Sequence, residues 1–383
     1  MSGSNYMEKL LDGVDVEWKP LGAVTTIKTG QSVNKQMISA NLGDYPVINS
    51  GREPLGFINI WNTNNDPIGV TTRGAGVGSI TWHEGKYYRG NLNYSVTINN
   101  NKKISTRYLY HLLLEMQADI QALCTYDGIP ALNAGNFKEL RIPIPCPENP
   151  KKSLEIQAEI VQILDTFTEL TAELTAELTA RKKQYNYYRD QLLTEVYDST
   201  KEFTIGEIID MRAGKNIKAK DIAEIETSEH KYTCYGGNGS RGFVSNYSHD
   251  GNYVLIGRQG ALCGNVKREK GRFYATEHAV ACSPKDDVNI DWVFYMLTFM
   301  NLNQYKSRSA QPGLAVGNIA KLPIKVPPIE EQTRIVAILD KFDALTNSIT
   351  EGLPREIELR QKQYEYYRDL LLSFPKPDAE VAA

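Results

Sequence analysis

The chain has 383 residues, of which 41% are hydrophobic and 23% charged, with a formal net charge of −3 at pH 7. This balance excludes a mainly disordered chain, and no apolar run approaches the roughly 18 residues of a membrane-spanning helix. The length predicts two or three domains. The five cysteines include no Cys-x-x-Cys pair, which favours reduced thiols and a cytoplasmic location. They are Cys124, Cys146, Cys234, Cys263 and Cys282.

The chain contains an internal repeat, because two segments of its first half recur in its second half. Lys-Gln-Tyr-Asn-Tyr-Tyr-Arg-Asp at 183–190 recurs as Lys-Gln-Tyr-Glu-Tyr-Tyr-Arg-Asp at 362–369, and the hexapeptide at 160–165 recurs in closely similar form at 335–340. Each copy is a globular block followed by a helical block. The predicted organisation is an N-terminal segment (1–19), a first globular domain (20–150), a central helical segment (151–200), a second globular domain (201–329) and a C-terminal helical segment (330–383).

Both globular blocks mix β-forming runs with glycine and asparagine. We expect strands near 70–72, 79–82, 94–98, 253–256 and 279–281, and helices near 108–122 and 292–303. The first block carries 11 Lys and Arg against 9 Asp and Glu, and the second 17 against 13, whereas both helical segments are net negative. The globular blocks are therefore the candidates for binding an acidic partner.

The first helical segment is expected to start at an N-cap, Ser153, after a proline-rich stretch. From Leu154 onward apolar residues recur every three or four positions, and Thr-Ala-Glu-Leu at 171–174 repeats at 175–178. A helix unbroken to Tyr197 would be about 65 Å long. Such a helix needs a partner for its apolar face.

The second helical segment supplies that partner, with a cap or kink at Gly352-Leu353-Pro354. The favoured arrangement is an antiparallel pair with one globular domain at each end. The alternative is that each helix folds back on its own globular domain. The predicted fold class is α+β, with two globular domains separated by two long antiparallel helices in a coiled-coil spacer and a pseudo-two-fold internal repeat.

A glycine-rich turn beginning with arginine lies at a matching place in each copy, at Arg73 and at Arg258. Neither turn matches a nucleotide-binding fingerprint, because β-forming residues follow where a helix should begin. A strand connection that needs positive φ is a sufficient explanation for the glycines. An arginine on such a loop can also contact guanine or a phosphate.

Basic and aromatic residues follow both turns, as expected of strands that track phosphates, although a solvated hairpin would look the same. The candidate DNA-binding residues are Arg52, Arg73, Lys86, Tyr87, Arg89, Arg241, Arg258, Lys267, Arg268, Lys270 and Arg272. The repeated Tyr-Tyr-Arg and the leucines of the tetrapeptides predict partner-binding or helix-packing positions, because tyrosine and arginine are favoured at interfaces. These are Leu170, Leu174, Leu178, Tyr187, Tyr188, Arg189, Tyr366, Tyr367 and Arg368.

No catalytic constellation is expected. Walker and nucleophile-elbow motifs are absent, and the five histidines show no metal-ligand spacing. Asp66 followed by Glu84-Gly85-Lys86 loosely resembles a nuclease pattern, but the second copy offers no equivalent. A stand-alone nuclease is therefore disfavoured.

Four sequence features together point to one family: the duplicated Lys-Gln-Tyr-x-Tyr-Tyr-Arg-Asp blocks, the Thr-Ala-Glu-Leu repeats, Ile-Pro-Ile-Pro-Cys-Pro at 142–147 and the stretch at 349–356. In these features the chain resembles the specificity subunits of type I restriction-modification systems, in particular type IC. The resemblance implies a non-catalytic protein. Each globular domain would read one half of an interrupted double-stranded DNA site, and the helices would set the half-site spacing and dock two methyltransferase subunits. Restriction subunits would join, and S-adenosylmethionine, ATP and Mg²⁺ would belong to those partners. The alternative is an interaction scaffold without DNA specificity.

Overall fold

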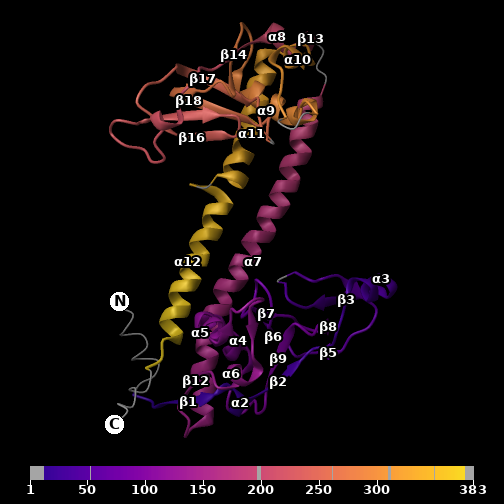
Figure 1. The fold of residues 1–383 in the computed structure, drawn as a ribbon, viewed down its shortest axis with the longest axis vertical. Coiled ribbons are helices and arrows are strands. Elements are labelled where there is room, and N and C mark those ends of the chain that lie inside the picture. Colours follow the sequence, from indigo (N-terminus) through magenta and orange to yellow (C-terminus); the bar gives the residue numbers. More distant parts are fainter. Residues whose placement is uncertain are drawn as a thin grey trace. The chain divides into compact units, whose positions relative to one another are not determined.

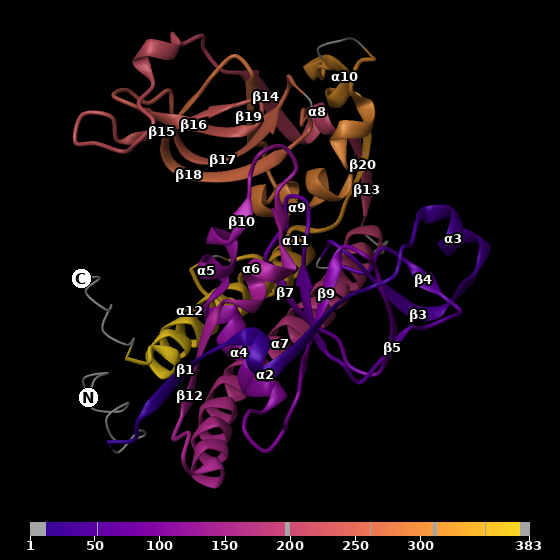
Figure 2. The same cartoon turned by 60° about the horizontal axis from the view of Figure 1, so that its bottom comes forward.

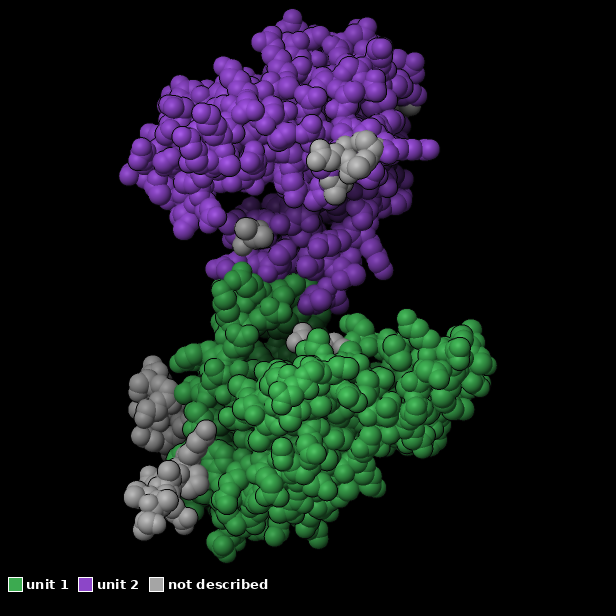
Figure 3. Space-filling view, viewed as in Figure 1, with its two compact units in different colours: residues 1–174, 357–383 green, residues 175–356 purple. Residues whose placement is uncertain are grey.

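The structure, a computed structural model, describes residues 13–51, 53–195, 200–260, 262–308, 312–348 and 350–375. The chain forms two compact units (Figure 3): unit 1 comprises residues 1–174 and 357–383, and unit 2 comprises residues 175–356. Each unit combines one globular region with parts of both helical segments. The division therefore falls inside two long helices and not at their ends.

Unit 1 contains two four-stranded sheets, with strand orders β2-β9-β6-β7 and β4-β3-β8-β5, and two strand pairs, β1-β12 and β10-β11 (Figure 1). Its strands are β1 (Val16–Pro20), β2 (Thr25–Thr29), β3 (Leu42–Ile48), β4 (Phe57–Ile58), β5 (Thr63–Asn64), β6 (Ile68–Thr71), β7 (Ile80–Trp82), β8 (Lys86–Arg89), β9 (Asn93–Ile98), β10 (Cys124–Thr125), β11 (Ala131–Leu132) and β12 (Arg141–Pro145). Its helices are α2 (Leu21–Val24), α3 (Lys35–Ala40), α4 (Thr106–Glu115), α5 (Gln117–Ala122), α6 (Ala134–Lys138) and the first part of α7 (Pro150–Thr194).

Unit 2 contains a six-stranded sheet of order β14-β19-β17-β18-β15-β16 and the pair β13-β20 (Figure 2). Its strands are β13 (Lys201–Thr204), β14 (Ile209–Ala213), β15 (Tyr232–Gly236), β16 (Gly239–Val244), β17 (His249–Gly257), β18 (Val266–Ala275), β19 (Ala279–Pro284) and β20 (Pro323–Val326). Its helices are α8 (Ile205–Ile208), η1 (Ala219–Asp221), α9 (Ile290–Phe299), η2 (Leu302–Tyr305), α10 (Val316–Ala320) and α11 (Ile329–Asn347). The last helix, α12 (Gly352–Leu372), begins in unit 2 and continues into unit 1. The α+β class and the internal repeat are confirmed.

The start of α7 differs from the prediction. The helix begins at Pro150, and Ser153, predicted as the N-cap, lies inside it with its side chain buried. Asn149 takes the capping role, since its side chain accepts a hydrogen bond from the N–H of Lys152 (3.1 Å). Proline suits the first helical position because its missing N–H would have no partner there. Tyr197, the predicted end, lies outside the described residues.

A buried glutamine joins each globular helix to the long helix beside it. The Gln157 side chain accepts a hydrogen bond from the N–H of Ser105 (2.9 Å) and donates to the carbonyl of Lys103 (3.0 Å). In unit 2, Gln332 accepts from the N–H of Asn289 (2.8 Å) and donates to two backbone carbonyls. Ser105 and Asn289 are the N-caps of α4 and α9. The glutamines therefore satisfy backbone groups that burial would otherwise leave unpaired.

Two long helices pack against each other within each unit. In unit 1 the ring of Phe167 in α7 stacks on Tyr367 of α12 with centroids 5.1 Å apart, and in unit 2 Tyr188 of α7 stacks on Phe342 of α11 at 5.8 Å. These are the same pair in the two repeats. The same helices also contribute to the hydrophobic core of their own unit. Both features that the sequence left open, helix against helix and helix against globular domain, are present in each unit.

The predicted interruption of the second helical segment is confirmed. Helix α11 ends at Asn347 and α12 begins at Gly352, whose φ is +74°. An added Cβ at Gly352 would lie 2.3 Å from the carbonyl oxygen of Ala344, so both the conformation and the space require glycine. No helix in the described part of the chain is long and apolar enough to cross a membrane.

Candidate nucleic-acid interface

A glycine turn follows β6 in unit 1 and β17 in unit 2. Gly74 and Gly260 both have φ of +93°, a conformation that disfavours other residues. The N–H of Gly74 donates to the carbonyl of Pro130 (2.9 Å), and the N–H of Gly260 donates to that of Pro312 (3.0 Å). Each turn is thus tied to a second loop, and the two units build the same pair of loops.

Single β-bridges between these loops show that the two arginines, predicted to occupy matching positions, do not correspond. Arg73 bridges to Ala131, but the residue bridged to the corresponding Gly313 is Gln259. Arg258 lies one position earlier and corresponds to Thr72. The carbonyl of Arg258 accepts a 2.8 Å hydrogen bond from the N–H of Leu314, and the carbonyl of Thr72 accepts the equivalent 2.8 Å bond from Leu132. The two turns therefore share a backbone but present different side chains.

The exposure of the turn arginines also differs. Arg73 is exposed, whereas Arg258 is half-buried. The buried Nε of Arg258 has no hydrogen-bond partner among the described residues. Arg241 is exposed on β16, and its side chain passes the backbone of Gly236 at the end of the adjacent strand. Arg52 lies outside the described residues.

Two of the predicted DNA contacts are interior residues. Arg89 is 3% exposed, and its side chain donates to the carbonyls of Ile68 (3.1 Å) and Tyr94 (3.0 Å), to the Asn93 side chain (2.6 Å) and to Tyr87. Tyr87 is also buried, and burial raises its pKa to about 12. Because these donors are already used inside the fold, the structure gives both residues a structural role in place of the predicted DNA contact.

Arg268 is likewise held by its own unit. Its guanidinium lies 2.6 Å from Asp340 of α11 and 3.5 Å from Asp291 of α9, over the rings of Phe294 and Tyr295. Hydrogen bonding to Asp340 raises the pKa of Arg268 against the opposing effect of burial. Arg268 therefore links β18 to α9 and α11 through ion pairs. Lys267 and Lys270, on either side of it, are exposed.

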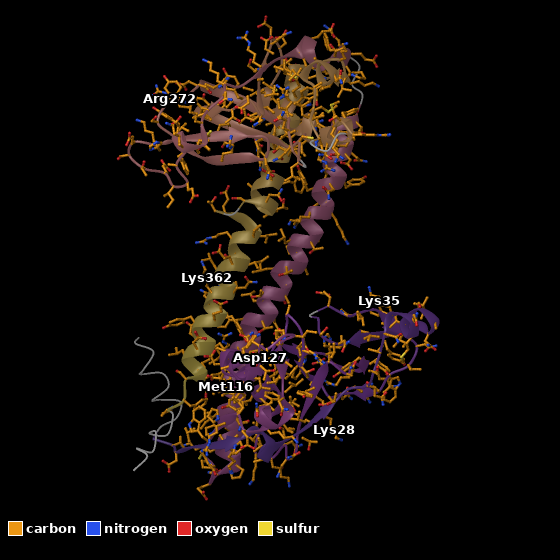
Figure 4. All side chains as sticks on the ribbon, in the orientation of Figure 1. Lys28, Lys35, Met116, Asp127, Arg272 and Lys362 are labelled. Atoms are coloured by element: carbon orange, nitrogen blue, oxygen red, sulfur yellow. The ribbon has the colours of Figure 1, made fainter. Side chains whose placement is uncertain are left out.

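Lys86 and Arg272 are exposed cations that each lie over an aromatic ring. The Lys86 ammonium is 4.8 Å from the ring centre of Trp61, and the Arg272 guanidinium is 4.9 Å from that of Tyr247. Figure 4 labels Arg272 on the sheet of unit 2. Trp61 and Tyr247 were not among the predicted residues. Tyr247 follows Trp61 by 186 residues, as Arg272 follows Lys86, so the shared spacing was a signal in the sequence.

The repeated Tyr-Tyr-Arg divides into three environments. The first tyrosine of each copy is the most exposed, Tyr187 at 59% and Tyr366 at 57%. The second, Tyr188 or Tyr367, stacks on a phenylalanine of the neighbouring helix as described above. Arg368 forms an ion pair with Glu115 of α4 (2.6 Å).

Arg189, the counterpart of Arg368, lies over the rings of Tyr185 (5.7 Å) and Phe299 (5.9 Å). The predicted leucines Leu170, Leu174 and Leu178 are half-buried on α7. Helix packing therefore accounts for the arginines and the second tyrosines, and the first tyrosines remain available to a partner.

The model of the type I restriction modification DNA specificity domain matches the chain twice, over residues 13–181 and 197–359. The chain belongs to this family. It is 46% identical to the specificity subunit of the type I restriction enzyme EcoprrI of Escherichia coli, over 92% of this chain and 93% of that protein. It is 36% identical to the EcoR124I/EcoR124II specificity subunit of the same organism, over 99% of both chains.

Solved structures of this family share the fold. The type I restriction-modification S subunit of M. genitalium matches with a TM-score of 0.69 at 20% identity, over 95% of this chain and 98% of that one. A structure from a study of complex assembly and conformational transition of a type I R-M system matches with a TM-score of 0.57 at 14% identity, over 93% and 97%. In the described ranges of this chain, no group of three or more His, Cys, Asp or Glu residues could hold a metal ion.

Proposed function

We propose that this chain is the DNA sequence-specificity subunit of a type I restriction-modification complex, and that each unit reads one half of a bipartite, interrupted double-stranded DNA site. The glycine turn built twice carries this proposal. Its backbone is the same in both units, but arginine at position 73 is replaced by glutamine at position 259. Arginine pairs with guanine and glutamine with adenine in the major groove. One scaffold is thus suited to reading two different half-sites.

The helical segments are proposed to set the spacing of the half-sites and to dock two methyltransferase subunits. The exposed Tyr187 and Tyr366 occur once in each repeat, as expected if the same partner binds twice. Restriction subunits would join this assembly. S-adenosylmethionine, ATP and Mg²⁺ would be bound by the partners, and this chain would be non-catalytic. Assignment to the type IC subgroup and a cytoplasmic location remain predictions.

The test is to map methylated bases in a cell that lacks other modification systems and expresses this chain with a type IC methyltransferase subunit. A two-part motif with a fixed gap, lost when this chain is omitted, is the expected result. Failure both to produce a motif and to co-purify with the methyltransferase would refute the proposal and favour an interaction scaffold. A complex that forms but produces no motif would contradict the DNA-reading role alone.

A further inference from the structure

Contacts shared by the two units and contacts that differ between them serve different purposes in a protein that reads two half-sites. The phosphate backbone is the same at every sequence, whereas base edges differ. A residue that contacts phosphate can therefore be shared by both units, and a residue that reads a base is free to differ. This reasoning rests on the function proposed above.

Strand pairing establishes which residues correspond. The parallel pair Val47–Tyr88 in unit 1 has its equivalent in Cys234–Tyr274 in unit 2. In each unit a glycine with positive φ comes directly before the cation, Gly85 ahead of β8 and Gly271 inside β18. Lys86 and Arg272 therefore occupy the same position on the same strand.

The cation–aromatic contact is kept although both of its members change. Lysine on tryptophan in unit 1 becomes arginine on tyrosine in unit 2, with nearly equal distances of 4.8 and 4.9 Å. Trp61 and Tyr247 are each 44% exposed. An aromatic face holds a cation in place and leaves its outer N–H groups directed to solvent. The contact thus presents a preorganised positive charge in both units.

Asp250 distinguishes the two pairs, because it forms an ion pair with Arg272. Its carboxylate accepts a 2.9 Å hydrogen bond from the Nε of Arg272, whereas Asn64 is the strand partner of Lys86. A guanidinium carries five N–H donors. The hydrogen bond to Asp250 raises the pKa of Arg272.

The cation lies four residues before an equivalent backbone contact in both units. Four residues of extended chain, about 13 Å, separate Lys86 from Gly90 and Arg272 from Thr276. Gly90 and Thr276 donate equivalent backbone hydrogen bonds to the neighbouring hairpin strand (2.7 and 2.8 Å). In unit 2 that hairpin lies against the turn, since an added Cβ at Gly237 would be 2.4 Å from the carbonyl oxygen of Gln259.

We propose that Lys86 on Trp61 and Arg272 on Tyr247 are the phosphate contacts of their units, and that the turn positions Arg73 and Gln259 are base contacts. The cation–aromatic pairs position each unit on the duplex whatever its sequence. The turn residues select the half-site.

The test uses the assembled complex of this chain with its methyltransferase subunits. Affinity for a cognate and a non-cognate duplex is measured over a range of salt concentrations, with Lys86→Ala, Arg272→Ala and the double variant. Each single variant should weaken binding to both duplexes by the same factor. It should also reduce the slope of log affinity against log salt concentration, here called the salt slope, by about 0.9, and the double variant should reduce this slope by about twice that. The ratio of cognate to non-cognate affinity and the methylated motif should not change. Lys86→Arg and Arg272→Lys should keep the wild-type slope.

Matched controls come from exposed lysines that the units do not share. Lys102 corresponds to Asp286 and Lys321 to Glu139, as the capping residues of the adjacent helices show. Lys102→Ala and Lys321→Ala remove the same charge and should leave the slope unchanged. Arg73→Ala should instead relax recognition within one half-site.

Three outcomes would overturn the inference: an unchanged salt slope in the double variant, an altered methylated motif in Lys86→Ala or Arg272→Ala, or loss of the methyltransferase subunits from the complex. The last would make the pairs a protein-docking feature, which would also be shared. A wild-type complex that binds both duplexes equally would refute the proposed function itself.

Discussion

Replacing Gln157 with leucine is expected to destabilise unit 1 strongly. The side chain satisfies the N–H of Ser105 and the carbonyl of Lys103 in a fully buried position. Leucine fills a similar volume but leaves both backbone groups without a partner, at a cost of about 1–3 kcal/mol each. The extra buried apolar surface offsets about 1 kcal/mol of this. The expected net loss in the free energy of unfolding is about 1–5 kcal/mol.

Urea unfolding of the full-length chain, followed by circular dichroism, measures this loss, and hydrogen exchange at the Ser105 amide locates it. The matched control is Gln162→Leu, an exposed position on the same helix, which should change stability by less than about 0.5 kcal/mol. Gln332→Leu should reproduce the effect in unit 2. If Gln157→Leu were as stable as Gln162→Leu, the glutamine would not be the link between helix and globular domain.

Gly214→Ala should destabilise unit 2 by about 1–3 kcal/mol, because the added Cβ would lie 2.1 Å from a backbone oxygen. The control is Gly317→Ala, whose added Cβ meets nothing within 4 Å, and equal thermal midpoints for the two variants would contradict the prediction. Burial lowers the pKa of His111 below its ordinary 6.5. Below about pH 6.5 the unfolded chain therefore binds a proton that the folded chain does not, and the free energy of unfolding decreases as the pH is lowered. His111→Tyr, which introduces the residue found at the equivalent position 295, should flatten that fall between pH 6.5 and 5, and an unchanged pH profile of the thermal midpoint would count against the assignment. One further Thr-Ala-Glu-Leu inserted after Leu178 adds about 6 Å of helix and should lengthen the gap in the methylated motif without altering either half-site; a motif with the original gap would exclude the spacer role.

The sequence by itself determined the features that depend on local pattern. The repeated octapeptides, the three-and-four spacing of apolar residues and the break at Gly352 predicted the duplicated α+β units and their long helices. They succeed because helical periodicity and glycine conformation are properties of short stretches of chain. The family resemblance rested on the same stretches, and the match over both halves of the chain confirms it.

Only the tertiary structure decided which cations face solvent. Lys86 and Arg89 belong to one basic cluster in the sequence, but Lys86 is exposed at the start of β8, whereas Arg89 at its end is buried, as are Tyr87 and Tyr88 between them. Arg268 and Arg272 share a face of β18, yet two helices cover the first and leave the second exposed. What covers a strand comes from segments distant in the chain. Alternation along a strand therefore predicts the two faces, and packing decides which of them can meet DNA.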